Sequence, residues 1–324
     1  PRWSIGTCVF FLIITAASGW WAFHRSIGDV NPGTPLLWPD SPYNTAIRKI
    51  NDRFAGFDVL QVVVEGRPES IKSSDGLNLM QSFQRYMELD PEVGATFSFA
   101  DQVSQVNRLF HGGLPKWSVI PDSNADAAMI FQLSMTGASP GDFDRLFNRN
   151  FSAGNVTVWY KDHRGDTVER ALHRAGTFMN ANPAPPGSDL HIRLAAGTIG
   201  LLGALNETIG RLEILTVVLI SLVIFAVTTF IYRSFTAGLL LTVISNTAYL
   251  MTSAIMYRLE IGLDVNTLPI GAVGMGIGID YNIYLMSRMC DEYRVNPNYS
   301  KLIPASIFTT GKAIFFTATT MIVG

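Results

Sequence analysis

The residue best suited to chemistry is Asp280, a carboxylate inside the apolar stretch Val265 to Arg288 (VNTLPIGAVGMGIGIDYNIYLMSR). The stretch is long enough to cross a membrane as a helix, and an aspartate there costs about 2.5 to 3.5 kcal/mol on insertion scales. Such a side chain usually faces a protein interior or an aqueous path and has a functional role. Protonation removes the charge, so we predict that Asp280 binds and releases a proton. The alternative is an aspartate that only pairs with a neighbouring helix.

The same helix has small residues at helical spacing. At 3.6 residues per turn, three glycines and one tyrosine form a single stripe: Gly271, Gly274, Gly278 and Tyr281. Asp280 lies about 100° from this stripe. Glycines let another helix approach closely, so we predict that the stripe serves helix packing. Because Asp280 and Tyr281 are adjacent, we expect their side chains to address different neighbours.

Three other polar residues are candidates for a relay with Asp280. Thr317 and Thr320 share one face of the last apolar run at i, i+3 spacing, so their hydroxyls could orient Asp280 or a water chain. The equally favoured alternative is that both hydroxyls bond to the backbone of their own helix. Asn282 is the third candidate, with packing as its alternative.

The sequence shows no recognisable catalytic or metal-binding set. It contains no HExxH, GxSxG, phosphate loop or CxxC pair. Asp162, His163 and Asp166 are close together in a predicted turn, which we interpret as a solvated polar loop. We therefore predict a protein that is not an enzyme, with no cofactor and no metal.

The composition predicts a membrane protein with one large extramembrane domain. Of the 324 residues, 48% are hydrophobic and only 15% are charged, which differs from the usual soluble domain. Ile5 to Phe23 contains no charge, and from Ile214 onwards the chain is again mostly apolar. The net charge of −2 says little about partners, and we predict no nucleic-acid partner.

Three regions follow from this distribution: a transmembrane helix in residues 1–23, an α+β domain in residues 24–212, and transmembrane helices 2 to 5 in residues 213–324. A cleaved signal peptide is the alternative for the first region. Met289 to Phe308 is predicted to link the helix of Asp280 to a truncated last helix. Pro1 is not an initiator methionine, and Ala313 to Gly324 is too short to cross a core of roughly 30 Å, so we expect a fragment of a longer protein.

Two strand-helix-strand units are predicted in the α+β domain. Their elements are Phe57 to Glu65, Ser74 to Leu89 and Val93 to Phe99, then Asn155 to Lys161, Thr167 to Met179 and Asp189 to Ala195. Alternating apolar residues mark the strands, and 3.6-residue spacing marks the helices. Residues 101–150 are predicted to be inserted helices and loops. Two such units in one domain suggest a split, ferredoxin-like arrangement.

Basic residues predict the orientation in the membrane. With a cytoplasmic N-terminus, most of the basic residues that flank the helices fall inside: Arg2, Arg233, Arg288, Arg294, Lys301 and Lys312. The short outer loop holds only Arg258. By the positive-inside rule, the α+β domain is then extracytoplasmic.

These features together resemble the resistance-nodulation-division (RND) superfamily, and most closely its MmpL-like lipid exporters, which are related to Patched and the sterol-sensing proteins. The resemblance rests on one helix followed by a large outer domain, on YRS at 232–234, on GIGIDY at 276–281 and on GKAIFFTATT at 311–320. It covers nearly the whole chain. The opening segment IGDVNPGTPLLWPDSPYN and the form GIGIDY look more like the second half of such exporters.

The resemblance implies a fold and a mechanism. It implies an α-helical membrane protein with an inserted extracytoplasmic porter domain, located in the bacterial cytoplasmic (inner) membrane. Two such halves make one protomer, so the partner of Asp280 and Tyr281 would lie in the missing half of the same polypeptide. A homo-oligomer is compatible with this. The implied activity is secondary active transport of lipids or other hydrophobic molecules, with protonation of Asp280 driving the change of state.

Two alternatives remain open. One is a lipid or sterol sensor of the Patched kind, without net transport. The other is a protein-translocation auxiliary resembling SecD and SecF, which also have an aspartate and a later arginine on one helix, as Asp280 and Arg288 stand here.

Overall fold

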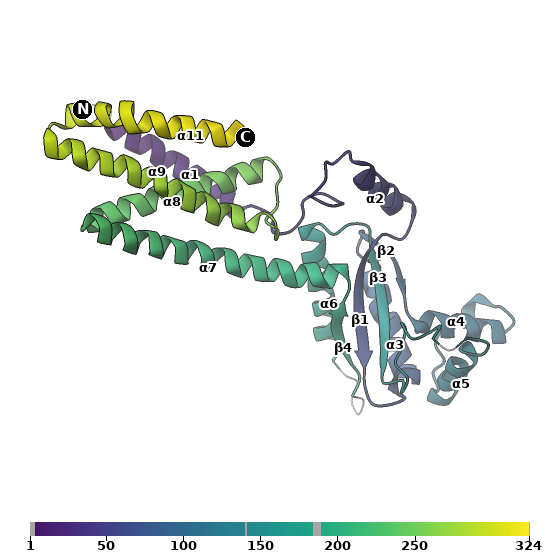
Figure 1. Cartoon of the computed structure of the whole chain (residues 1–324). Coiled ribbons are helices and arrows are strands. Elements are labelled where there is room, and N and C mark those ends of the chain that lie inside the picture. Colours follow the sequence, from purple (N-terminus) through teal and green to yellow (C-terminus); the bar gives the residue numbers. More distant parts are fainter. Residues whose placement is uncertain (1–3, 140, 184–188, 324) are drawn as a thin grey trace. The chain divides into compact units, whose positions relative to one another are not determined.

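The computed structural model describes residues 4–139, 141–183 and 189–323, and the predictions that involve Pro1 and Gly324 lie outside them (Figure 1). The chain divides into two compact units. One comprises Pro1–Ile27 with Thr208–Gly324, and the other comprises Gly28–Glu207. We call them the helical unit and the α+β unit.

A four-stranded antiparallel sheet in the order β2-β3-β1-β4 forms the centre of the α+β unit (Figure 1). The strands are β1 (Asp58–Glu65), β2 (Val93–Phe97), β3 (Ala153–Tyr160) and β4 (His191–Ala196). Alternate residues of β1 (Leu60, Val62 and Val64) are fully buried, as a pleated strand with one covered face requires.

Two helices complete the predicted strand-helix-strand units. These are α3 (Ser74–Met87) and α6 (Gly165–Ala181). They pack on each other through an edge-to-face contact in which the rings of Phe83 and Phe178 lie 5.3 Å apart. Leu77 and Met80 of α3 are also fully buried and belong to the same core as the sheet.

The insert between β2 and β3 adds an aromatic group to the core of the sheet. It contains α4 (Phe99–Phe110), the short helical turn η2 (Pro115–Trp117) and α5 (Asn124–Ser134), whereas the turn η1 (Ser70–Lys72) lies between β1 and α3. Phe99 contacts the rings of Phe131, Phe143 and Phe147 at centroid distances of 4.5 to 5.1 Å. These side chains fill the core instead of lining an open apolar pocket.

Helix α2 (Pro42–Arg53) has no counterpart among the predicted elements. No helix was predicted between the proline-rich segment before it and the strand that begins at Phe57. Instead, Ser41 caps the helix by accepting a hydrogen bond from the Asn44 N–H, and Pro42 occupies a first-turn position. Proline suits that position because its backbone nitrogen needs no acceptor there.

The helical unit contains α1 (Ser4–Phe23), most of α7 (Thr198–Tyr232), α8 (Phe235–Arg258), α9 (Leu268–Val295), α10 (Tyr299–Ser306), η3 (Ile307–Gly311) and α11 (Lys312–Val323). In the described part of the chain, four helical stretches are long and apolar enough to cross a membrane: Gly6–Phe23, Thr198–Tyr232, Phe235–Arg258 and Lys301–Val323. Helix α8 packs against both α1 and α9. The chain is a multi-pass membrane protein.

Helix α9 is not one of those four stretches. Its 28 residues give a length of about 42 Å, which exceeds the hydrocarbon core. However, Asp280, Asn282 and several glycines lower its mean hydropathy. The polar residues for which a function is predicted also separate α9 in composition from the other long helices.

The predicted linker from Met289 to Phe308 is helical over most of its length. Helix α9 continues to Val295, and a second helical stretch runs from Tyr299 to Val323. Pro304 lies inside this stretch, and a π turn, η3, follows it. Proline removes a backbone donor, and a π turn accommodates such an irregularity without ending the helix.

Candidate functional site

Asp280 lies near the middle of α9, and its side chain is exposed. No residue in the described ranges donates a hydrogen bond to its carboxylate or pairs with it. The start of α9 is fixed by Asp264, whose Oδ1 accepts from the N–H groups of Asn266 and Thr267 at 2.9 and 2.7 Å. Because its side chain is exposed and has no partner among the described residues, Asp280 faces away from the helices of its own unit.

Tyr281 points to a different neighbour. Its hydroxyl donates to Sδ of Met321 on α11, at 3.4 Å. The two adjacent side chains of the predicted coupling pair therefore meet different surroundings. A role for Tyr281 in coupling stays a prediction.

The three predicted relay residues make no contact with Asp280. Thr317 donates to the carbonyl of Ala313 at 2.9 Å, and Thr320 donates to that of Phe316 at 2.8 Å. Both bonds lie within α11. The side chain of Asn282 is half-buried, and no residue that the structure describes bonds to it.

The predicted glycine stripe is in close contact at one position only. A Cβ atom on Gly271 would lie 2.5 Å from the ring of Tyr249 on α8, so these two helices meet closely there. A Cβ atom added at Gly274 or Gly278 would have no described atom within 4 Å. These two glycines face open space in the structure.

The YRS segment determines how α7, α8 and α9 join. Tyr232 ends α7, and its hydroxyl donates to the carbonyl of Ile283 at 3.0 Å and lies 2.8 Å from the hydroxyl of Ser287. Arg233 takes a left-handed conformation, with φ of 49°. Ser234 then caps α8 by accepting from the N–H of Ala237.

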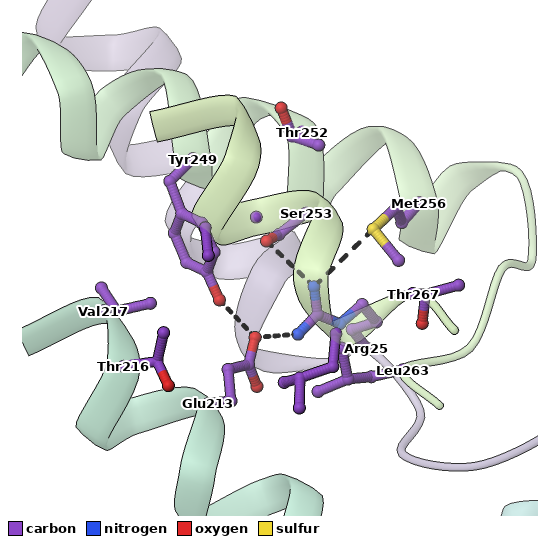
Figure 2. A pocket seen from close by; sticks show the side chains of 13 residues that line it. Arg25, Glu213, Thr216, Val217, Tyr249, Thr252, Ser253, Met256, Leu263 and Thr267 are labelled. Carbon is purple, nitrogen blue, oxygen red and sulfur yellow. Dashed lines mark hydrogen bonds and ion pairs between the residues drawn. The ribbon is translucent and has the colours of Figure 1, made fainter. Parts of the chain in front are cut away.

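A buried polar cluster, which the sequence did not indicate, lies within the helical unit (Figure 2). Arg25 follows α1 and pairs with Glu213 of α7, whose Oε1 also accepts a hydrogen bond from the Tyr249 hydroxyl. Arg25 Nη1 donates to Ser253 Oγ of α8 at 3.0 Å. The side chains of Arg25 and Glu213 are 6% and 19% exposed, so this is a largely buried ion pair. Removing one member of such a pair leaves the other charge without compensation.

Arg25 and Glu213 escaped notice because each flanks an apolar run in the sequence. Arg25 follows the run that ends at Phe23, and Glu213 precedes the run that starts at Ile214. Charges at such positions usually face the membrane interface. The pairing depends on α1 and α7 lying close to α8, which only the tertiary structure reveals.

His163 is part of a second polar network, in the α+β unit. Its Nδ1 lies 2.7 Å from Asp58 Oδ2, and its Nε2 lies 2.9 Å from the Gly33 carbonyl oxygen. Asp29 Oδ2 is 3.5 Å from the same Nε2. The His163 side chain is 15% exposed and Asp162 is buried, so the interpretation of this turn as a solvated loop was wrong for these two residues, whereas Asp166 is exposed as expected.

The charge of His163 follows from these contacts. Both ring nitrogens face a carboxyl or carbonyl oxygen, an arrangement that favours the form of His163 in which both carry a hydrogen. Burial by itself lowers the pKa of His163, but the hydrogen bond and charge of Asp58, the Gly33 carbonyl and the charge of Asp29 outweigh it, and the pKa lies above its ordinary value. The imidazolium holds the segment that precedes α2 onto the turn between β3 and α6.

In the part of the chain that the structure describes, no group of three or more His, Cys, Asp or Glu side chains could hold a metal ion. Arg288 pairs with Glu292, at 2.5 Å, on its own helix. It does not contact Asp280, so the spacing that suggested a SecD-like or SecF-like pair forms no ion pair here.

Comparison with known proteins gives consistent matches. The model of the MMPL family matches residues 36–324. The membrane protein MJ1562 of Methanocaldococcus jannaschii is 25% identical over 292 residues, which cover 89% of this chain and 72% of that protein. The cryo-EM structure of the hedgehog release protein Disp from the water bear Hypsibius dujardini is similar with a TM-score of 0.53 and 14% identity, over 95% of this chain and 42% of that one. This last likeness concerns the fold alone, and the chain spans less than half of that protein.

Proposed function

This chain belongs to the MMPL family, whose members are transporters and not enzymes, and we propose that it exports lipids or other hydrophobic molecules by using a proton gradient. In this proposal Asp280 is the proton-binding group. Its protonation removes a charge from the middle of α9 and changes which arrangement of the helices is favoured. Such a shift requires that the proton bind one arrangement more tightly than the other.

The observation that supports this most directly is the exposed, unpaired carboxylate of Asp280 among the described residues of α9. A charge facing lipid at this depth is unfavourable, whereas one facing protein or water is tolerated. A further helical element therefore covers this face in the working protein. The RND resemblance implies the other half of the same polypeptide, and a second copy of the chain would supply an equivalent surface.

We assign the α+β unit to the extracytoplasmic side and to the ferredoxin-like porter class. Support comes from the basic residues on the predicted cytoplasmic side and from the antiparallel order β2-β3-β1-β4 with two strand-helix-strand units. A bacterial cytoplasmic membrane is the location that the family resemblance favours. The substrate class rests on the same resemblance, because fold alone does not determine function.

The test compares Asp280→Asn with Asp291→Asn in the full-length protein. Asp291 also lies on α9 and is exposed, near the helix end. Purified protein in liposomes is given a pH gradient, and proton uptake is followed with an enclosed pH-sensitive dye. In cells, accumulation of the hydrophobic dye Nile red reports export. We expect Asp280→Asn to abolish both signals and Asp291→Asn to retain them at equal membrane levels.

Two outcomes would contradict the proposal. Normal proton uptake by Asp280→Asn would exclude Asp280 as the coupling group. Absence of both proton uptake and dye export in the unchanged protein, at normal membrane levels, would instead favour the Patched-like sensor. The family match makes a SecD-like or SecF-like role the weakest alternative.

A further inference from the structure

The buried cluster of Arg25, Glu213 and Tyr249 joins four segments of the helical unit (Figure 2). Arg25 comes from the segment after α1, Glu213 from α7 and Tyr249 from α8, and all three meet at Glu213 Oε1. The ring of Tyr249 rests against Gly271 of α9. Since α9 also contains Asp280, the cluster is in direct contact with the helix of the proposed proton site.

The cluster also lies beside both points where the chain passes between the two units. The boundaries fall after Ile27 and before Thr208. Arg25 stands just before the first boundary in sequence, and Glu213 stands one to two helical turns beyond the second. The ion pair thus ties the two passages of the chain to each other.

One hydrogen-bonding group of the cluster has no protein partner. Arg25 Nε is buried and has no acceptor among the described residues, although the Arg25 side chain is only 6% exposed. Arg25 also lines a cavity of about 20 Å³, whose walls combine apolar side chains with polar ones such as Thr216, Ser253 and Thr267. This volume is sufficient for one water molecule. Arg25 and Glu213 already neutralise each other, so the cavity suits a neutral acceptor and not an ion.

We propose that this cluster, with one water in its cavity, is the junction through which movement of α9 reaches both chain passages and hence the α+β unit. The inference rests on the proposed function, in which protonation of Asp280 moves α9. Tyr249 and Glu213 act as positioning residues in this scheme. Neither side chain contacts Asp280. They act by transmitting the displacement of Gly271 on α9.

The water has a physical role in this junction. A dry buried ion pair resists displacement because each separated charge loses its compensation. A bridging water offers Arg25 an alternative hydrogen bond of nearly equal enthalpy while the helices shift. Arg25 can then exchange one hydrogen-bond acceptor for another without being left as an uncompensated buried charge.

The experiment measures two distances in the full-length protein with spin labels, after Cys8→Ala and Cys290→Ala. Labels at Tyr284→Cys of α9 and Phe316→Cys of α11 form the near pair, which reports movement of α9. Labels at Phe230→Cys of the helical unit and Leu89→Cys of the α+β unit form the far pair. All four positions are exposed. Each distance is measured at mildly acidic and at mildly alkaline pH.

We expect pH to shift both distances in the otherwise unchanged protein. Tyr249→Phe, which removes one hydroxyl and keeps the ring, should preserve the near shift and abolish the far shift, and Glu213→Gln should do the same. Tyr257→Phe on the same helix is the matched control, because no described residue bonds to its hydroxyl, and it should preserve both. Equal thermal stability of Tyr249→Phe and Tyr257→Phe separates lost transmission from misfolding.

Each other outcome is informative. A far shift that persists in Tyr249→Phe and Glu213→Gln overturns the junction, and so does a far pair that never responds while the near pair does. If the pH-dependent change in the near-pair distance persists in Asp280→Asn, Asp280 is not the proton site. The movement of α9 that the junction is proposed to transmit then has another cause. For the water, a high-resolution map should show density beside Arg25 Nε, and a dry cavity would refute that part.

Discussion

Gly271 of α9 lies so close to Tyr249 of α8 that a Cβ atom at position 271 would be 2.5 Å from Cε2 of the tyrosine ring. Gly271→Ala should therefore force the two helices apart, at a cost of about 1 to 3 kcal/mol for overpacking. Thermal unfolding of the full-length protein in detergent measures the effect. Gly274→Ala is the matched control, because a Cβ there meets no described atom within 4 Å. Equal Tm values for the two variants would contradict the close contact.

His163 should make the α+β unit more stable at mildly acidic pH. Its folded pKa is raised above the ordinary 6.5, so its stabilisation is complete below that value and is lost as pH rises through the folded pKa. His163→Gln should thus speed hydrogen exchange of residues 28–34 at low pH and have little effect at high pH. His173→Gln, at an exposed position, should behave as the unchanged protein. A difference that grew with pH would show that the imidazolium is not the stabilising form.

Gly94 should tolerate no side chain. A Cβ atom there would lie 1.9 Å from the backbone oxygen of Ala55, which cannot move aside as a flexible side chain would. We expect Gly94→Ala to lower the free energy of unfolding by about 1 to 3 kcal/mol. Gly176→Ala, inside α6 and with no neighbour within 4 Å, should raise it by about 0.5 to 1 kcal/mol. Denaturant titration distinguishes these opposite signs.

The hydroxyl of Tyr232 should stabilise the contact between α7 and α9. Tyr232→Phe removes its bond to the Ile283 carbonyl and its contact with Ser287, which should cost about 0.5 to 1.5 kcal/mol. Tyr284→Phe is the control, since no described residue bonds to that exposed hydroxyl. If both variants unfold at the same temperature, the YRS tyrosine does not hold the two helices together.

Local patterns in the sequence were sufficient for most of the sheet and for the long helices. The β-branched, apolar residues of Phe57 to Glu65 predicted β1, and the structure adds that alternate residues of this strand are buried. Helix α2 was missed although Ser41 and Pro42 form a recognisable start, because the surrounding prolines outweighed that signal. The family was recognisable from motifs such as GIGIDY.

The polar networks could not be predicted from the sequence. Arg25 and Glu213 are far apart in the chain, and nothing local distinguishes them from interfacial charges. His163 was likewise misjudged because its partners Asp58 and Gly33 come from distant segments. Burial of a charge depends on which segments meet, and hydrophobic periodicity does not encode that.

The π turn at Ile307–Gly311 alters the angular phase of everything after it. A π turn holds more residues than an α turn, so the helix beyond it is rotated relative to an uninterrupted α-helix, by roughly 100° for one extra residue. The meeting of Met321 with the Tyr281 hydroxyl depends on that rotation. Deleting Thr309 should restore the α-helical phase and turn Met321 away from the Tyr281 hydroxyl. For the same reason, a helical wheel drawn across this segment as one α-helix assigns its faces wrongly.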